Sequence, residues 1–306
     1  MIYAAKNKVI DARFGDKKVL KMMLGDVNMY TTEFPVTCDL ENVTSDAPFT
    51  VLYGNSLSVT LSGTGSNKVQ ENSVVVMMGG VDITSTAYDH STKTITIANV
   101  TGNISIAAVG RPYDAEVEYL QGDGSAYIDT GINTKYNIMM EAGIRIESSS
   151  ANIIDICGAR SSTSSNQNAV LFYYANGFLY RFNTTNKYAS SAKSLGDYTI
   201  KTTTYSDRST LYVSGAATGN AEITQRASFS TSIHYLIFNF SNNGTPQTPA
   251  GAGLKIKYFK LYDGSTLVRD FIPVKDNNIG YLYDKVSGQL YGNANSSGAF
   301  TYGNDV

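Results

Sequence analysis

The chain has 306 residues, which is enough for two or three domains of ordinary size. Charged residues make up 16% of it and the formal net charge is −2, so the composition excludes a generally basic surface for nucleic acid. No run of about 18 apolar residues predicts a membrane span, and no apolar stretch after Lys6 and Lys8 predicts a secretory signal. The 22 tyrosines and 27 glycines predict an all-β protein of short strands joined by turns.

Residues 1–33 contain two similar segments, Phe14-Gly15-Asp16 and Leu24-Gly25-Asp26. The Gly-Asp pairs predict tight turns between short strands. Because so small a set of strands is marginally stable alone, its apolar side chains need another surface to cover them. We expect that surface to be either another protein, which makes residues 1–33 a docking segment, or the domain that follows. The candidate docking residues are Val19, Leu20, Met22, Met23 and Leu24.

Residues 34–111 carry few charges and alternate apolar and polar side chains, as in Ser56–Leu61 and Thr94–Ile97. A period of two residues, with turn signals about every ten, predicts an antiparallel β-sandwich. The stretch Val76–Val109 resembles the last strands of bacterial immunoglobulin-like (Ig-like) modules, which implies a spacer. Pro112 in the sequence Arg111–Asp114 predicts a linker, because proline disfavours the continuation of a strand. A further domain is therefore expected over residues 112–306.

This last region has recognisable motifs at both ends, namely Glu118-Tyr119-Leu120 and Tyr127–Ile132 at the start, and Leu267–Pro273 and Tyr281–Asp284 near the end. They resemble the opening and closing strands of concanavalin A-like, laminin G-type jelly-roll domains in bacteriophage virion surface proteins of the gut. The resemblance implies a jelly-roll sandwich whose first and last motifs pair in the same sheet. It also implies a non-enzymatic virion structural protein, which displays a lectin-like domain for attachment to host-surface glycans.

The same resemblance implies where the protein acts and with what. We expect it at the virion surface, as a capsid decoration, head fibre or tail appendage made in the host cytoplasm. Its expected partners are other capsid or tail proteins and host glycans, and a homo-oligomer is expected. Two alternatives stay open, which are a capsule-degrading glycoside hydrolase on a jelly-roll fold and a bacterial surface adhesin.

The sequence provides no candidate for catalysis. Glycoside hydrolysis needs two carboxyl groups across a cleft, whereas Glu141 and Glu147 are expected too far apart along one strand. His90 and His234 are the only histidines, and neither belongs to a recognisable triad. The cysteines Cys38 and Cys157 predict two separate buried thiols and not a disulfide.

Metal and cofactor sites are not predicted either. The number of cysteines and histidines excludes a zinc site of the usual kind. Calcium is the alternative to no cofactor, since lectin-like jelly rolls often hold it through aspartate oxygens. The candidate residues do not lie in an acidic run, so turn formation is the preferred interpretation. They are Asp123, Asp129, Asp155 and Asp197.

Sugar binding requires aromatic faces beside amide and guanidinium groups. The segment from Arg160 to Tyr188 is the richest in these groups, and it also contains Arg181. Strand alternation must turn about half of its side chains inward. The candidate carbohydrate-binding residues are Arg160, Asn166, Tyr174, Tyr180, Asn183 and Tyr188.

Overall fold

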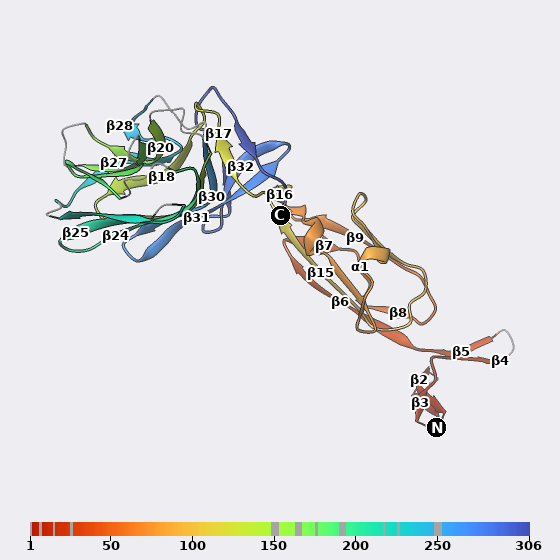
Figure 1. Ribbon diagram of the computed structural model, residues 1–306. Coiled ribbons are helices and arrows are strands. Elements are labelled where there is room, and N and C mark those ends of the chain that lie inside the picture. The colour runs from red at the N-terminus through yellow and green to blue at the C-terminus, as the bar shows by residue number, and fades with distance from the viewer. Residues whose placement is uncertain are drawn as a thin grey trace. The chain divides into compact units, whose positions relative to one another are not determined.

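The computed structural model describes most of the chain and divides it into two compact units, Met1–Pro112 and Tyr113–Val306 (Figure 1). We call them the N-terminal and C-terminal units. Between residues 1 and 30, side chains are described only for residues 13 and 16–22. The described residues are 2–5, 8–14, 16–24, 27–147, 153–162, 167–174, 177–189, 194–216, 218–224, 227–247 and 253–306.

The protein is all-β, as its composition predicts. In the described part of the chain, the helical elements are one turn each, η1 (Glu71–Ser73) and α1 (Thr84–Ala87). None of the described helices has the length and apolar character of a membrane-spanning segment. Strands therefore build both units.

The first thirty residues form short strands that flank the two predicted turns. Strands β1, β2 and β3 make one small sheet, and β4 and β5 pair separately. Leu20 is tied to the start of the sandwich, because the Thr32 backbone N–H donates to its carbonyl at 2.8 Å. Val19, Leu20 and Met22 are half-buried, while the side chains of Met23 and Leu24 lie outside the described part. The strands are β1 (Ile2–Ala5), β2 (Lys8–Phe14), β3 (Lys17–Lys18), β4 (Lys21–Leu24) and β5 (Val27–Thr31).

The rest of the N-terminal unit is a sandwich of two sheets. One has the order β12-β11-β15-β6-β8 with β10 beside β15, and the other has the order β13-β14-β9-β7. Their facing sides bury alternate residues, such as Val59 on β9 and Ile104 and Ile106 on β15. The strands are β6 (Glu33–Glu41), β7 (Val43–Ser45), β8 (Thr50–Leu52), β9 (Leu57–Gly63), β10 (Lys68–Val69), β11 (Val75–Met78), β12 (Val81–Asp82), β13 (Tyr88–Asp89), β14 (Thr94–Ile97) and β15 (Ile104–Arg111).

One prediction for this unit is wrong. Cys38 is exposed, whereas Cys157 in the C-terminal unit is buried as predicted. Strand β6 pairs with β8 only through Glu33–Pro35. At Cys38 that edge of β6 has no paired strand, while the other edge pairs with β15. Its Sγ faces the Ser45 hydroxyl at 3.7 Å and not an apolar cover.

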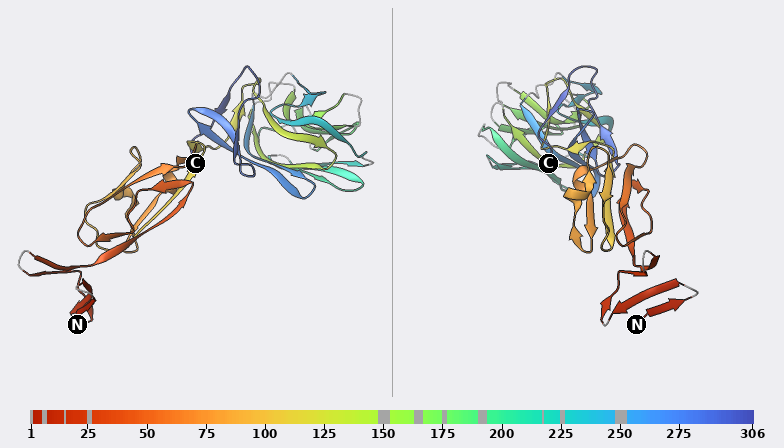
Figure 2. Two further views of the ribbon diagram at one scale, coloured as in Figure 1. Left: turned by 180° about the vertical axis from the view of Figure 1, so that it is seen from behind. Right: turned by 90° about the vertical axis from the view of Figure 1, so that its right-hand side faces the viewer.

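The C-terminal unit is a second, larger sandwich, whose two sheets appear as facing layers in Figures 1 and 2. The first sheet has the order β26-β25-β24-β19-β30-β31-β32-β33, with β16, β17 and β34 at its side, and the second has the order β18-β27-β20-β21-β22-β23, with β28 and β29. The strands from β16 to β25 are β16 (Ala115–Glu116), β17 (Leu120–Gly122), β18 (Ile128–Lys135), β19 (Ile138–Ile146), β20 (Ile153–Arg160), β21 (Asn168–Tyr174), β22 (Gly177–Phe182), β23 (Thr185–Tyr188), β24 (Gly196–Thr204) and β25 (Arg208–Gly215). The remaining strands are β26 (Gly219–Thr224), β27 (Ser230–Ile237), β28 (Ser241–Asn242), β29 (Thr245–Pro246), β30 (Leu254–Asp263), β31 (Thr266–Asp276), β32 (Ile279–Asp284), β33 (Gln289–Tyr291) and β34 (Phe300–Tyr302).

The predicted end motifs meet as strands of this unit. Leu120 pairs with Ile256 on β30 and with Tyr302 on β34, and β16 pairs with β31, so the start and the end of the unit lie in the first sheet. The motif Tyr127–Ile132 instead contributes β18 to the second sheet. Tyr113, which the sequence places in the linker, is 1% exposed and packs edge-on against Tyr283. The folded unit therefore includes Tyr113.

Candidate functional site

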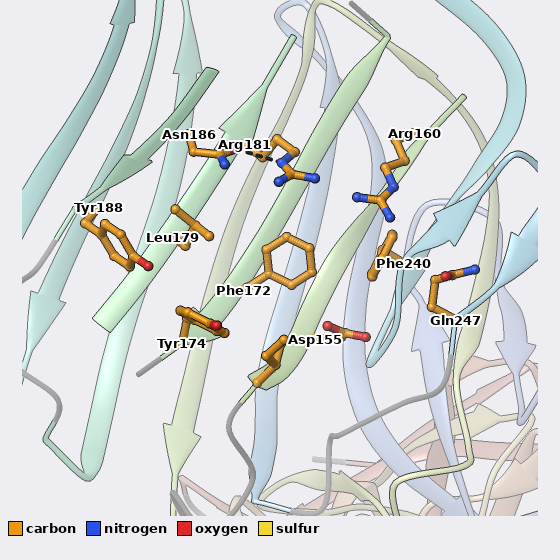
Figure 3. A pocket seen from close by; sticks show the side chains of 11 residues that line it. Asp155, Arg160, Phe172, Tyr174, Leu179, Arg181, Asn186, Tyr188, Phe240 and Gln247 are labelled. Atoms are coloured by element: carbon orange, nitrogen blue, oxygen red, sulfur yellow. Dashed lines mark hydrogen bonds between the residues drawn. The ribbon is translucent and has the colours of Figure 1, made fainter. Parts of the chain in front are cut away.

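A pocket of about 630 Å³ lies on the second sheet of the C-terminal unit, on the face turned away from the main core (Figure 3). Its volume falls in the range typical of small-ligand sites, roughly 300–1,000 Å³. Phe172, Phe240 and Val170 form a small apolar cluster there, separate from the core between the sheets, and Leu179 packs against it. The pocket is lined by Ile153, Asp155, Arg160, Phe172, Tyr174, Leu179, Arg181, Asn186, Tyr188, Phe240 and Gln247.

Strand register brings these side chains together. Asp155, Phe172, Leu179 and Tyr188 are consecutive partners across β20, β21, β22 and β23, so they form one row across four strands. Side chains that are directly opposite on neighbouring strands share a face of the sheet. The alternate residues of the same strands, such as Leu171 and Tyr180, point into the main core.

A β-bulge in β20 places Asp155 and Arg160 in the same pocket. The two residues are five apart, so strict alternation would put them on opposite faces. Asp155 pairs with Phe172 and Cys157 pairs with Leu171, which leaves Ile156 as an extra residue on β20. Ile156 and Cys157 both enter the main core, and the parity of the strand changes between them. The bulge is therefore the feature that lets one strand supply both groups.

A second irregularity brings Phe240 and Gln247 to the pocket. Phe238 has a positive φ of 64°, which is rare for an aromatic residue, and its ring stays in the core. The next residue, Asn239, is fully buried and its Oδ1 accepts from the backbone N–H groups of Phe240 at 2.7 Å and Gln247 at 3.2 Å. These two hydrogen bonds hold the chain in a turn, and Phe240 lies on the opposite face of the sheet from Phe238. Strained backbone of this kind is often found at functional sites.

Two arginines lie in the pocket with their orientation fixed. Arg160 Nε donates to Asn242 Oδ1 at 3.1 Å, and its guanidinium carbon is 4.7 Å from the centre of the Phe240 ring. Arg181 Nε donates to Asn186 Oδ1 at 2.6 Å. Burial lowers the pKa of Arg160, as does the charge of Arg181, while Asp155 raises it; the group remains charged under all ordinary conditions.

Asp155 is the one acidic group among the described lining residues. It is 4% exposed, and no described residue donates a hydrogen bond to its carboxyl group. Burial raises the pKa of Asp155 to about 7, although the charge of Arg160 lowers it. A carboxyl group in this state can accept a hydrogen bond when ionised and donate one when protonated.

The six predicted carbohydrate-binding residues separate into three groups. Arg160, Tyr174 and Tyr188 line this pocket. Tyr180 is 2% exposed in the core, where its hydroxyl bonds to Ser209 Oγ at 2.8 Å, and Asn183 is 5% exposed and bonds to the backbone of Ala227. These two residues do not reach the surface, so they are not available to a ligand. Asn166 lies outside the described residues.

The remaining lining groups are not among the six predicted residues, although the predicted segment contains Arg181. Arg181 follows Tyr180 on β22, and a charged residue at that position is a signal that Tyr180 points inward, because neighbours on a strand point to opposite faces. The sequence indicates a calcium ligand or a turn residue at Asp155, and the bulge that turns it into the pocket has no clear signature in the sequence. Phe240 and Gln247 come from a distant segment whose turn depends on the buried Asn239.

The other candidate calcium ligands and His90 make contacts within the fold, away from the pocket. Asp123 accepts from the backbone N–H groups of Ser125 and Ala299, Asp129 contacts His234 Nδ1 at 2.9 Å, and Asp197 pairs with Arg145 and Lys257. His90 packs edge-on against Tyr88. Among the described residues, no three acidic, His or Cys side chains form a group suited to a metal ion.

Comparison with known proteins gives no family for this chain. No protein-family model and no curated protein sequence matches it. A solved structure from Bacteroides ovatus ATCC 8483, described as a "putative carbohydrate binding protein", is similar at 10% identity and a TM-score of 0.43. The match covers 89% of this chain and 97% of that one. At this level the likeness is too distant to indicate a ligand for the chain.

Proposed function

We propose that the C-terminal unit is a glycan-binding module without catalytic activity, and that the pocket on its second sheet is the binding site. The observation that carries this proposal is the combination of groups in that pocket. An apolar floor of Phe172, Phe240 and Leu179 lies beside the oriented polar groups of Arg160 and Arg181. Sugar rings offer both an apolar C–H face and a rim of hydroxyl groups, and this pocket is complementary to both.

The rim of the pocket suits a sugar that remains partly in solvent. Tyr188 is 41% exposed and Tyr174 is half-buried, so each offers part of its ring as a stacking surface. Asn186 and Gln247 add amide groups at the edge. Such contacts give weak affinity for each site, since polar surface must lose water for a modest gain. Useful attachment then requires several copies acting together.

Binding without hydrolysis is favoured over the glycosidase alternative by the count of carboxyl groups. Hydrolysis uses two carboxyl groups about 5–9.5 Å apart, one on each side of the scissile bond. Asp155 is the single carboxyl group among the described lining residues. We therefore propose that the module holds a glycan and does not cleave it.

We further propose that a bacteriophage virion displays this module at its surface. The support is the resemblance of the end motifs to those of phage surface proteins. In this proposal residues 1–33 dock onto a capsid or tail protein, the Ig-like sandwich acts as a spacer, and host glycans are the partners of the C-terminal unit. A homo-oligomer on the particle would supply the multiple copies that weak sites require.

Alanine at the two rim tyrosines tests the binding site. We expect Tyr174→Ala and Tyr188→Ala each to lower the affinity for a glycan by about twofold to tenfold, because an aromatic contact contributes roughly 0.5–1.5 kcal/mol. The matched control is Tyr212→Ala, since Tyr212 is 39% exposed on β25 in the first sheet. The measurement is binding of the multimerised protein to a broad glycan array, followed by titration of the best probe.

Two results would contradict the proposal. The first is that the multimerised wild type binds no glycan on the array. The second is that Tyr212→Ala weakens binding as much as the two rim variants, which would place the site elsewhere. Release of new reducing ends from a bound polysaccharide would overturn the part of the proposal that excludes catalysis.

A further inference from the structure

We propose that the pocket selects an acidic sugar, whose carboxylate is held between Arg160 and Arg181. This inference rests on the proposed glycan-binding function and names the class of glycan. It concerns the positive charge of the pocket, which a neutral sugar bound by the same hydrogen-bond donors does not require.

The first observation is that both guanidinium groups are anchored in the same way. Each Nε is bonded to an asparagine side chain, Asn242 for Arg160 and Asn186 for Arg181. Among the described residues, nothing bonds to the terminal Nη atoms of either arginine. In Figure 3 the two guanidinium groups point toward one another above the Phe172 ring. The planar Nη edge of a guanidinium matches a carboxylate with two parallel hydrogen bonds.

The second observation is the lack of compensating charge. Neither arginine forms an ion pair with a described carboxylate, and Arg181 lies close enough to Arg160 to lower its pKa. Asp155, the one acidic lining residue, is partly protonated near neutral pH because burial raises its pKa to about 7. Among the described residues, the other titratable side chains that line the pocket are Tyr174 and Tyr188, and neither is a carboxylate or an amine. The described lining residues therefore give the pocket a net positive charge, and an anion between the arginines offsets their mutual repulsion.

The remaining groups define how a sugar ring fits. Phe172, Leu179 and Phe240 offer an apolar floor below the guanidinium groups, suited to the C–H face of the ring. Asp155 lies beside this floor, nearly buried and without a described hydrogen-bond donor, so a ring hydroxyl is its natural partner. A neutral sugar would satisfy the floor and Asp155 but would leave both arginines without an anion. A hexuronic or sialic acid would contact the apolar floor with its ring, Asp155 with a hydroxyl group and the two arginines with its carboxylate.

The test compares sugars that differ only in the acid group. The probes are hyaluronan, polygalacturonate and polysialic acid, each beside its carboxyl-reduced form, together with a sulfated neutral galactan and unsulfated dextran. We expect at least one acidic probe to bind ten times or more tightly than its reduced form, and the difference to shrink when salt is raised from 50 to 500 mM. A bidentate arginine–carboxylate contact is strong enough to give this ratio.

Variants assign the effect to the two arginines. Arg160→Gln and Arg181→Gln should each lower the affinity for the acidic probe about tenfold or more and change the affinity for the reduced probe less than threefold. Arg208→Gln is the matched control, because Arg208 also stacks on an aromatic ring, Tyr205 at 4.2 Å, but lies on β25. Arg181→Lys keeps the charge without the planar fork and should retain part of the preference. Thermal melting of each variant confirms that it is folded.

The outcomes separate this inference from the proposed function. If dextran or the reduced probes bind as well as the acidic ones, glycan binding stands and the acidic preference is overturned. If the sulfated galactan binds more tightly than every carboxylate probe, the pocket selects sulfate and the carboxylate assignment is overturned. If no probe binds, both proposals fail. An equal loss of affinity in Arg208→Gln would show that the effect comes from general surface charge.

Discussion

At the scale of single residues, Asp155 is the group whose burial costs stability. A buried carboxyl group resists ionisation, because charge is poorly solvated in the protein interior. With its pKa raised to about 7, Asp155 keeps its proton in the folded state over a pH range in which the unfolded chain, with a pKa near 3.8, has lost it. The folded state therefore binds more protons between about pH 4 and pH 7, and the free energy of unfolding falls as the pH rises through this range. Well above pH 7 the carboxyl group is ionised in both states, and the free energy of unfolding no longer falls on its account.

This linkage predicts the effect of Asp155→Asn. Removing the ionisable group should leave the free energy of unfolding nearly unchanged at pH 3, where the carboxyl group is protonated in both states, and raise it at pH 8, by up to about 4 kcal/mol for a difference of about three pKa units. Urea unfolding of the C-terminal unit at the two pH values measures the change. Asp207→Asn serves as a control, since Asp207 is 68% exposed and its replacement should change stability by less than about 0.5 kcal/mol. A variant no more stable than the wild type at pH 8 would contradict the assigned cost.

A stabilising substitution at a pocket residue has a simple interpretation. Surfaces that bind ligands keep groups that a purely structural position would lose, because activity and stability compete. Asp155 has no described hydrogen-bond donor, and its charge is only partly offset by Arg160. This cost is consistent with the ligand contact that we propose for Asp155.

At the scale of strands, the alternation of side chains between the two faces of the sheet decides which predicted residues reach the pocket. The sequence of β22 is Gly-Phe-Leu-Tyr-Arg-Phe, and its inward residues are the aromatic Phe178, Tyr180 and Phe182. The position of Arg181 was enough to assign these faces, so the burial of Tyr180 could have been predicted. On β20 the same reasoning fails, because Ile156 is an extra residue and all of Ile154–Cys157 is apolar or buried. A bulge depends on the pairing of two strands, and one strand's sequence does not specify it.

The bulge in β20 predicts a sensitive position at Gly158. This residue has a φ of +140°, and an added Cβ would lie 2.5 Å from the Ala169 carbonyl oxygen and 2.6 Å from Val170 Cα. Gly158→Ala should therefore force β20 and β21 apart, lower the free energy of unfolding by roughly 2–4 kcal/mol and weaken glycan binding, because Arg160 follows two residues later. Urea unfolding and probe titration measure both effects.

Gly244→Ala is the control that distinguishes the cost of a positive φ from the cost of a steric clash. Gly244 also has a positive φ, of 82°, but an added Cβ there meets no atom within 4 Å. Its replacement should cost only about 1 kcal/mol. Equal losses in the two variants would show that the close approach of β20 and β21 is not what makes Gly158 sensitive.

At the scale of the whole chain, the two units have separate cores. The described core residues of the N-terminal unit run from Val36 to Ala108, and those of the main C-terminal core run from Leu120 to Phe300. Alternating patterns and turn signals were sufficient to predict two sandwiches, since both depend on local sequence. The start of the second unit was less predictable. Pro112 suggested a linker through Asp114, but Tyr113 is held by a contact with Tyr283, which is 170 residues away in the sequence.

Separate cores predict that the functions assigned to the parts can be separated by truncation. A fragment that begins at Tyr113 keeps the whole main core and the contact between Tyr113 and Tyr283, so it should unfold cooperatively and bind glycan with the affinity of each site in the full chain. A fragment that begins at Thr31 keeps every described core residue of both units and should also fold, since none of the described side chains before Phe34 belongs to the N-terminal core. Neither fragment has the strands β1 to β4, which we propose dock onto the virion.

Both fragments should therefore retain glycan binding and fail to enter particles. Titration measures the binding, and quantifying the protein in purified particles measures the incorporation. Incorporation of the Thr31 fragment at the level of the full chain would exclude the docking role, and a Tyr113 fragment that aggregates while the full chain stays folded would show that the C-terminal unit depends on the residues before it.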